Sequence, residues 1–348
     1  MLKANFKKYI LNFKQASGTS RGVLKTKQTF FLLLSKNGKQ GIGECGLFRG
    51  LSIDDRSDYE EKLKWVCEYI SLGKEALLNI LYEYPSIQFG LEQAFLSLQS
   101  NNKFELFDTS FVHAKEPISI NGLIWMGDAD FMQRQIEDKL AAGFKTIKLK
   151  IGAIDFDKEC KLLASIRERF SAQEIELRVD ANGGFTAQEA LRKLERLSKF
   201  DLHSIEQPIR QGQVEKMKYL CEKTPLPIAL DEELIGVFSK EAKEILLEEI
   251  RPQYIILKPS LIGGIQGSNE WISIAENKHI DWWITSALES NIGLNAIAQY
   301  TSSLNTTLPQ GLGTGALFTN NIEAPLSVKN GNLLYDRSKP WASLNFNI

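Results

Sequence analysis

Residues 146–151 are Thr-Ile-Lys-Leu-Lys-Ile and residues 175–180 are Ile-Glu-Leu-Arg-Val-Asp, two short, largely apolar runs that carry ionisable side chains toward their ends. Similar runs recur from residue 117 onward, and most are followed by an amphipathic pattern of about 10 to 15 residues. Regular alternation of short strands with helices is typical of a parallel sheet. The larger part of the chain is therefore predicted to have an α/β fold.

We expect eight strands in this part of the chain, which is enough to close a (β/α) barrel. Their expected ranges are 118–122, 146–151, 175–180, 203–207, 228–231, 254–258, 282–286 and 310–314. An open, doubly wound sheet is the competing architecture. Such sheets usually carry a glycine-rich dinucleotide loop after the first strand, and this sequence has none. The pattern favours the barrel.

The first 115 residues have a different pattern of predicted strands and helices. Strand-like alternation over residues 9–13 is followed by a Gly/Ser-rich loop at 16–22 and a second strand at 29–35. The Asn37-Gly38 pair predicts a hairpin turn, and helical patterns follow over 63–70 and 89–98. We therefore expect an α+β domain over residues 1–115 and the barrel over 116–320.

Composition excludes several classes of function. The chain has 348 residues, 42 basic and 43 acidic side chains and a net charge of −1, which argues against nucleic-acid binding as its main role. Its longest apolar run, residues 30–34, is far shorter than a membrane span. Lysines interrupt any signal-peptide core near Met1, and the four cysteines form no CxxC pair. We expect a cytoplasmic protein that binds neither membranes nor nucleic acid.

Carboxylates end three successive expected strands. Asp180, Glu206 and Asp231 lie about 25 residues apart, so the barrel would bring them to one rim, where barrel enzymes place their active sites. Three ionised carboxylates held together need a cation, and an oxygen-only ligand set suits Mg²⁺, with Mn²⁺ as an alternative. Taken singly, each acid is equally well explained as a turn residue or a solvated loop acid.

Lysines occupy matching positions on either side of these acids. Lys148 and Lys150 are two residues apart on one strand and so face the same way, and Lys258 ends a strand across the barrel. A nearby cation and partial burial would lower the pKa of a lysine and make it available as a base. A metal flanked by two lysines suits removal of a proton α to a carboxylate.

These residues resemble the enolase superfamily, and the Lys-x-Lys strand end resembles its muconate-lactonising subgroup. Four segments are most similar to the o-succinylbenzoate synthase family within it: 20–22, 41–45, 120–127 and 286–293, and residues 311–315 fit the same group. The resemblance implies a (β/α)₇β modified TIM barrel. It also implies that residues 1–115 form a capping domain together with the C-terminal tail, 321–348, and that the loop Ser17–Gly22 is a mobile lid.

The resemblance further implies a reaction and roles for individual residues. The expected reaction is Mg²⁺-dependent syn-dehydration of the dicarboxylate 2-succinyl-6-hydroxy-2,4-cyclohexadiene-1-carboxylate to o-succinylbenzoate, a lyase step in menaquinone biosynthesis. Asp180, Glu206 and Asp231 would bind the metal. Lys150 would be the base and then the acid, and Lys258 would stabilise the anion by charge and cation–π attraction.

Weaker candidates for substrate contact are Lys148, Asn182, Ser286, Gly313, Thr314, Arg21 and Arg178. For each of them a structural role is at least as well supported, with Ser286 as a helix cap and Arg178 as a partner of a carboxylate. Glu289 is expected behind the site, where it would orient a lysine, and not on the metal.

Alternative functions stay open at this point. An N-acyl amino acid racemase or a dipeptide epimerase would use the same two lysines, although residues 310–315 lack the aspartate pair with which dipeptide epimerases bind the substrate ammonium. Muconate cycloisomerisation is a weaker choice. A non-catalytic barrel that only binds a metal or a metabolite would lack at least one charged group, and all are present. The sequence fits a monomer and a homo-oligomer equally.

Overall fold

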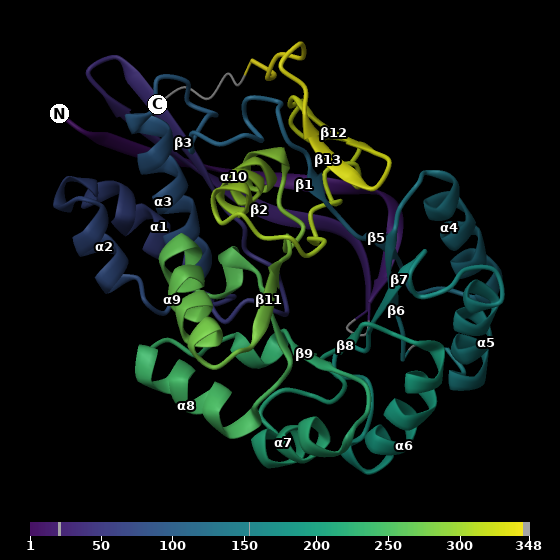
Figure 1. The fold of residues 1–348 in the computed structure, drawn as a ribbon. Coiled ribbons are helices and arrows are strands. Elements are labelled where there is room, and N and C mark those ends of the chain that lie inside the picture. Colours follow the sequence, from purple (N-terminus) through teal and green to yellow (C-terminus); the bar gives the residue numbers. More distant parts are fainter. Residues whose placement is uncertain (20–21, 153, 344–348) are drawn as a thin grey trace.

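Seven parallel strands form a curled sheet at the centre of the larger domain (Figure 1). The computed structural model describes residues 1–19, 22–152 and 154–343, with the backbone alone for residues 16–19. Hydrogen-bonded neighbours in this sheet follow the order of the chain. The strands are β5 (Gly122–Ile124), β6 (Thr146–Lys150), β7 (Glu176–Asp180), β8 (Ser204–Glu206), β9 (Ile228–Leu230), β10 (Tyr254–Leu257) and β11 (Asp281–Ile284).

The ring closes through two isolated bridges instead of an eighth full strand. Gln310 pairs with Ile120, and Gly311 pairs with Thr285 at the end of β11. The expected strand 310–314 is therefore wrong in extent, because this Gly-rich segment has few side chains to pack and strands weaken at glycine. The expected strand 118–122 is also divided: β4 (Ile118–Ser119) pairs outside the barrel, and β5 begins at Gly122.

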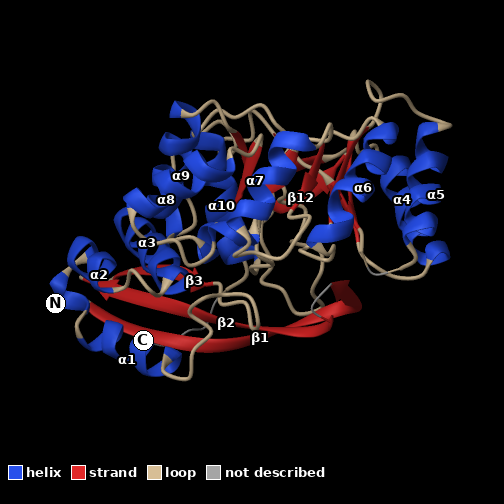
Figure 2. Ribbon diagram, turned by 90° about the horizontal axis from the view of Figure 1, so that it is seen from below, coloured by secondary structure: helices blue, strands red, loops and turns tan. Residues whose placement is uncertain are grey.

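Helices cover the outside of the sheet, as the alternating pattern predicts (Figures 1 and 2). Val179 and Ile205 are buried in the layer between strands and helices, whereas Ala229, Ile256 and Trp283 form a separate cluster of buried residues. The covering helices are α4 (Ala129–Ala141), α5 (Phe156–Arg167), α6 (Ala187–Leu197), α7 (Val214–Lys223), α8 (Lys240–Ile250), α9 (Gly264–Asn277) and α10 (Asn291–Ser303). None of the helices in the described part of the chain is long and apolar enough to cross a membrane.

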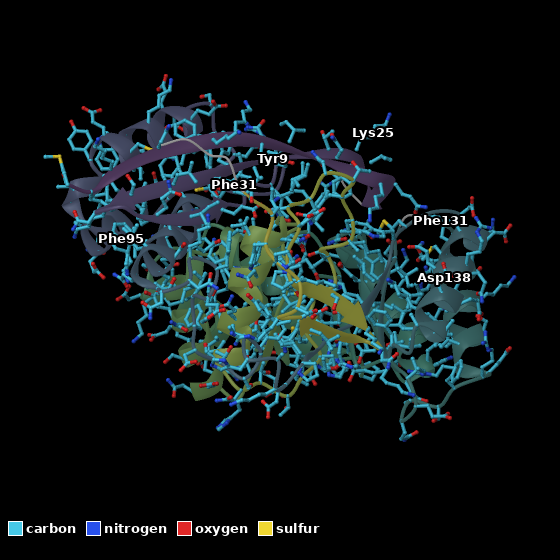
Figure 3. All side chains as sticks on the ribbon, turned by 90° about the horizontal axis from the view of Figure 1, so that it is seen from above. Tyr9, Lys25, Phe31, Phe95, Phe131 and Asp138 are labelled. Carbon is cyan, nitrogen blue, oxygen red and sulfur yellow. The ribbon has the colours of Figure 1, made fainter. Side chains whose placement is uncertain are left out.

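An antiparallel sheet and three helices make up the N-terminal part. Its strands are β1 (Lys3–Thr19), β2 (Gly22–Lys36) and β3 (Lys39–Cys45), in that spatial order, and its helices are α1 (Tyr59–Glu68), α2 (Lys74–Ile80) and α3 (Pro85–Gln99). The Gly/Ser-rich stretch was expected to be a loop. Instead, residues 17–19 pair with residues 22–24, so β1 and β2 form one long ribbon whose far end lies near α4 (Figure 3).

Buried polar contacts join this N-terminal part to the barrel. Glu44 on β3 accepts hydrogen bonds from the backbone N–H groups of Ser290 and Gly293, both at 2.9 Å, at the start of α10. Glu92 on α3 accepts hydrogen bonds from the N–H groups of Ile265 (2.5 Å) and Gln266 (2.9 Å) in the first turn of α9. These carboxylates satisfy amides that have no partner within their own helices.

The C-terminal segment contacts both parts. Strands β12 (Leu326–Lys329) and β13 (Asn332–Tyr335) form a hairpin that pairs with β4 through Leu333 and Ile118. Further along, the Trp341 ring stacks on Phe104 with centroids 4.1 Å apart. The boundaries at residues 115 and 320 stay a prediction.

Candidate active site

The register of the parallel strands aligns the predicted site residues. Lys150 pairs with Asp180 between β6 and β7, and Asp180 pairs with Glu206 between β7 and β8. Asp231 directly follows β9 and Lys258 directly follows β10, at the same ends of their strands. Five side chains that are far apart in sequence therefore gather at one rim of the sheet.

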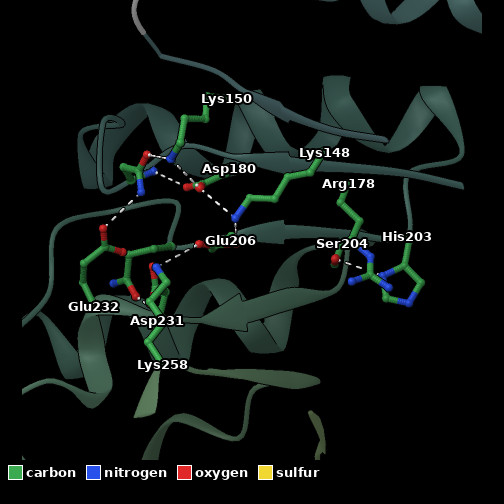
Figure 4. Close-up of polar contacts among 12 residues, drawn as sticks. Lys148, Lys150, Arg178, Asp180, His203, Ser204, Glu206, Asp231, Glu232 and Lys258 are labelled. Atoms are coloured by element: carbon green, nitrogen blue, oxygen red, sulfur yellow. Dashed lines mark hydrogen bonds and ion pairs between the residues drawn. The ribbon is translucent and has the colours of Figure 1, made fainter. Parts of the chain in front are cut away.

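Lysine ammonium groups lie between the carboxylates (Figure 4). Nζ of Lys148 is 3.0 Å from Oδ2 of Asp180 and also contacts Glu206. Nζ of Lys150 is 2.9 Å from the same Asp180 oxygen. Lys258 reaches the acids from the other side, where it contacts Asp231 and lies 3.8 Å from Oε1 of Glu206.

Burial and charge act together on this cluster. Burial raises the pKa of Glu206 and the neighbouring charge of Asp180 raises it further, whereas the lysines hold the pKa of Asp180 and Asp231 below its ordinary value despite their burial. Burial alone would lower the pKa of Lys148 and Lys258, but the carboxylates outweigh it and raise both values. The prediction of a lowered lysine pKa invokes a nearby cation and stays a prediction.

The acids fit a hard cation in type and environment. In the described part of the chain, no group of three or more His, Cys, Asp or Glu side chains is already arranged around a metal position. However, Oε1 of Glu206 is buried and accepts no hydrogen bond from the described residues. The negative charges of Asp180 and Asp231 repel Glu206 and raise its pKa in addition to burial. A divalent cation would relieve that repulsion and supply the missing partner.

A cavity of about 310 Å³ opens onto the site. Lys148, Lys150, Asp180 and Lys258 line it, whereas Glu206 and Asp231 are buried and do not line it. Gln15, Phe48 and Leu51 of the N-terminal part also line it, so both parts of the chain contribute to the cavity. The sequence analysis did not select these three residues, because nothing local marks a residue that reaches a site built by another domain.

Asn182 lines the cavity and connects the base to a fourth acid. Its Oδ1 accepts a hydrogen bond from Nζ of Lys150 at 2.6 Å, and its Nδ2 donates to Glu232 at 3.1 Å. Glu232 is buried and its charge contributes to the raised pKa of Lys258. The sequence analysis missed Glu232 as a site residue, although its place directly after Asp231 was a signal.

Ser286, Gly313 and Thr314 line the neutral wall of the cavity. Ser286 is not the cap of α10; that role belongs to Ser290, whose hydroxyl accepts from the N–H of Ile292. Glu289 is buried and accepts from the hydroxyls of Ser260 (2.5 Å) and Ser286 (2.6 Å). No hydrogen bond among the described residues joins it to Lys148, Lys150 or Lys258, so it fixes the wall and does not orient a lysine directly.

Arg178 does not join the site. It is buried, donates to Glu176 (2.7 Å) and to the carbonyl of Pro309 (2.9 Å), and lies over the Trp283 ring at 4.3 Å. Figure 4 places it beside Ser204 and His203, away from the carboxylates. Strand alternation correctly puts it on the inner face of the sheet. However, it is two residues before Asp180 on β7 and therefore farther from the rim that carries the site. Arg21 lies outside the described residues.

Comparison with known proteins agrees with this geometry. Residues 131–339 match the family model described as "Enolase C-terminal domain-like". The chain is 47% identical to an o-succinylbenzoate synthase of Desulfotalea psychrophila, over 95% of this chain and 98% of the relative. The crystal structure of MenC from the same organism superposes with a TM-score of 0.86, at 44% identity, and covers 95% of this chain and 99% of that one.

Some more distant relatives have other names. An L-Ala-D/L-Glu epimerase of Bacillus subtilis is 28% identical, but the match covers only 49% of this chain and 46% of the epimerase. The similarity to o-succinylbenzoate synthase instead spans nearly the whole of both chains, capping part included. The chain therefore belongs to the o-succinylbenzoate synthase family of the enolase superfamily.

Proposed function

We propose that this chain is a lyase that dehydrates 2-succinyl-6-hydroxy-2,4-cyclohexadiene-1-carboxylate to o-succinylbenzoate, the menaquinone-pathway step expected from the sequence. The observation that carries the proposal is the family match over 95% of the chain, joined to Lys150, Asp180 and Glu206 in register at one strand rim. The enzyme removes a proton from C1 and hydroxide from C6, so one water leaves and the ring becomes aromatic.

Lys150 is the proposed base. Its amine takes the C1 proton, and the resulting ammonium returns that proton to the departing hydroxyl on the same face. Asp180 and Asn182 hold Nζ of Lys150 at 2.9 and 2.6 Å, which fixes its direction toward the cavity. Bound Mg²⁺, held by Asp180, Glu206 and Asp231, would stabilise the negative charge that develops on the ring carboxylate.

Lys258 is proposed to act from the opposite side. It stays charged beside Asp231, because the carboxylates raise its pKa, and a fixed ammonium near the ring stabilises the delocalised anion. The ion pairs of the three lysines with the three acids offset part of the negative charge of the cluster. A divalent cation would offset more of it, which suits a dicarboxylate substrate.

The test is an ultraviolet assay of the purified chain with the cyclohexadiene substrate, with and without Mg²⁺. Loss of the diene absorbance that depends on Mg²⁺, with o-succinylbenzoate identified as the product, supports the proposal. A folded, Mg²⁺-loaded protein that does not turn the substrate over contradicts it. In that case α-proton exchange of N-acyl amino acids in D₂O tests the racemase alternative. The metal's identity and a cytoplasmic location stay proposals.

A further inference from the structure

We propose that Asn121 is a substrate-binding residue whose carboxamide donates a hydrogen bond to an oxygen of the succinyl side chain, at the end of the substrate away from the metal site. The inference rests on the proposed function and deepens it. No pattern in the sequence marked Asn121 as a site residue; it stands between Ile120 and Gly122 at the start of the barrel.

The side chain of Asn121 is buried and has no protein partner. The residue is 5% exposed, and its Oδ1 is buried without a hydrogen bond in the described part of the chain. Its Nδ2 donates no hydrogen bond to a described residue and, unlike Oδ1, is not among the buried unpaired atoms. A ketone or carboxylate oxygen can pair only with the NH2 group of the carboxamide, so the inference rests on this unused donor.

The fold directs Asn121 into the catalytic cavity. Its backbone N–H donates to the carbonyl of Gln310 at 2.9 Å, which fixes Asn121 at the seam where the barrel closes. Leu123, two residues along, is in register with Lys148 on β6. Asn121 and Leu123 line the same cavity as Lys148 and Lys150, so Asn121 and the proposed base border one space.

Two glycines lie on the segment beside Asn121. Gly311 and Gly313 line the cavity on the neighbouring segment. A Cβ at Gly313 would lie 3.4 Å from Cδ1 of Ile120 and 3.6 Å from the carbonyl oxygen of Asn121, and a Cβ at Gly311 would come within 2.4 Å of Oγ1 of Thr285. A side chain at Gly311 would therefore collide with Thr285, and one at Gly313 would lie against Ile120 and Asn121.

The nearby hydroxyls are already committed as donors. Ser286 donates to Glu289 at 2.6 Å, and Thr314 donates to Oγ of Ser286 at 2.9 Å. Neither hydroxyl has a hydrogen left for a carbonyl or carboxylate oxygen of a ligand. Asn121 therefore supplies an uncommitted side-chain donor on this wall, whereas the lysines opposite are paired with the metal-site acids.

The substrate's chemistry matches this division of the cavity. Its ring carboxylate belongs with the cation site, and its succinyl chain carries a ketone and a second carboxylate that need donors elsewhere. A neutral amide can donate to either oxygen without adding charge beside the reacting ring. An apolar side chain at residue 121 would leave that oxygen without a partner after it has lost its water.

The test compares two ligands on one variant. Asn121→Leu keeps the side chain's shape but removes its hydrogen bonding, and Asn5→Leu, on exposed β1, is the matched control. We measure the Kd of o-succinylbenzoate and of benzoate, which lacks the succinyl chain, by calorimetry with Mg²⁺ present. The expected result is a rise of about tenfold for o-succinylbenzoate in Asn121→Leu, with benzoate and the control unchanged.

Two further results complete the test. In turnover, KM for the cyclohexadiene substrate should rise about tenfold in Asn121→Leu while kcat changes much less. Equal weakening of both ligands, or no weakening of either in a folded variant, overturns the proposal and leaves Asn121 a structural or water-binding residue. Failure of the wild type to bind o-succinylbenzoate would instead count against the proposed function.

Discussion

Lys150 and Asp180 face each other across the register of β6 and β7, with Nζ of the lysine 2.9 Å from Oδ2 of the aspartate. One carboxylate thus has two proposed roles, as a metal ligand and as the group that positions the base. Lys148 contacts the same oxygen at 3.0 Å. Asn182 accepts a hydrogen bond from the same Nζ of Lys150 at 2.6 Å, so a proposed metal ligand and a neutral amide position the base together.

Removing the proposed base should abolish turnover without unfolding the protein. Lys150→Ala should lower kcat by about 10³-fold or more, because general-base catalysis contributes on that order. The control is Lys145→Ala, at an exposed lysine just before the same strand. Steady-state kinetics and circular dichroism of both variants make the check, and near-normal turnover by folded Lys150→Ala would refute the assigned role.

Lys258 should stabilise the anion formed during the reaction and should contribute little to Mg²⁺ binding. Lys258→Ala should reduce kcat severely, because the ammonium that faces the developing charge is lost, while Lys278→Ala on the outer surface should have no effect. The Mg²⁺ concentration that gives half-maximal activity should change little in Lys258→Ala. Turnover close to wild type would exclude electrostatic stabilisation by this lysine.

Neutralising one ligand should weaken the metal site. Asp180→Asn keeps the shape of the side chain but removes a charge, so the Kd of Mg²⁺ should rise at least about tenfold. Asp201→Asn, at an exposed turn, is the control. Calorimetric titration with Mg²⁺ measures both. An unchanged titration would show that Asp180 is not a ligand.

Glu92 should make stability depend on pH. Burial raises the pKa of Glu92 from 4.5 to about 7, although the amides of Gln266 and Ile265 oppose that shift. The folded state therefore holds the proton more tightly than the unfolded state. The contribution of Glu92 is fully present below pH 4.5 and is lost as pH rises to 7, a change of about 3 kcal/mol at most.

Denaturant unfolding between pH 4.5 and 8 measures that loss directly. In Glu92→Gln the residue no longer titrates, so the free energy of unfolding should fall less steeply over this range than in the wild type. Glu249→Gln, at an exposed glutamate, should keep the wild-type slope. Parallel curves for the wild type and Glu92→Gln would contradict the assignment.

Local sequence was enough to predict most of the barrel and the charged rim. An apolar run that ends in Asp180 or Lys258 carries its own strand and its own polar end, so both could be read from a few residues. The eighth strand, predicted at 310–314, is reduced to two bridges, because Gly311 and Gly313 offer few side chains to pack. The long ribbon of β1 and β2 was hidden by its Gly/Ser-rich end.

Contacts between segments that are distant in sequence could not be predicted from local patterns. Glu44 meets Ser290, and Glu92 meets Ile265, only after the capping part docks on the barrel. Arg178 shows a related limit: alternation gives the face on which a side chain lies, but not its depth along the strand. Asn121 is conspicuous only once its missing hydrogen bonds can be examined in three dimensions.

The most direct test of the central claim is to follow the cyclohexadiene substrate by ultraviolet absorbance with wild-type protein and Lys150→Ala in parallel, each with and without Mg²⁺. We predict conversion to o-succinylbenzoate only by the wild type and only with Mg²⁺, although both proteins bind the product. Conversion by Lys150→Ala at the wild-type rate, or none by folded, Mg²⁺-loaded wild type, would contradict the account.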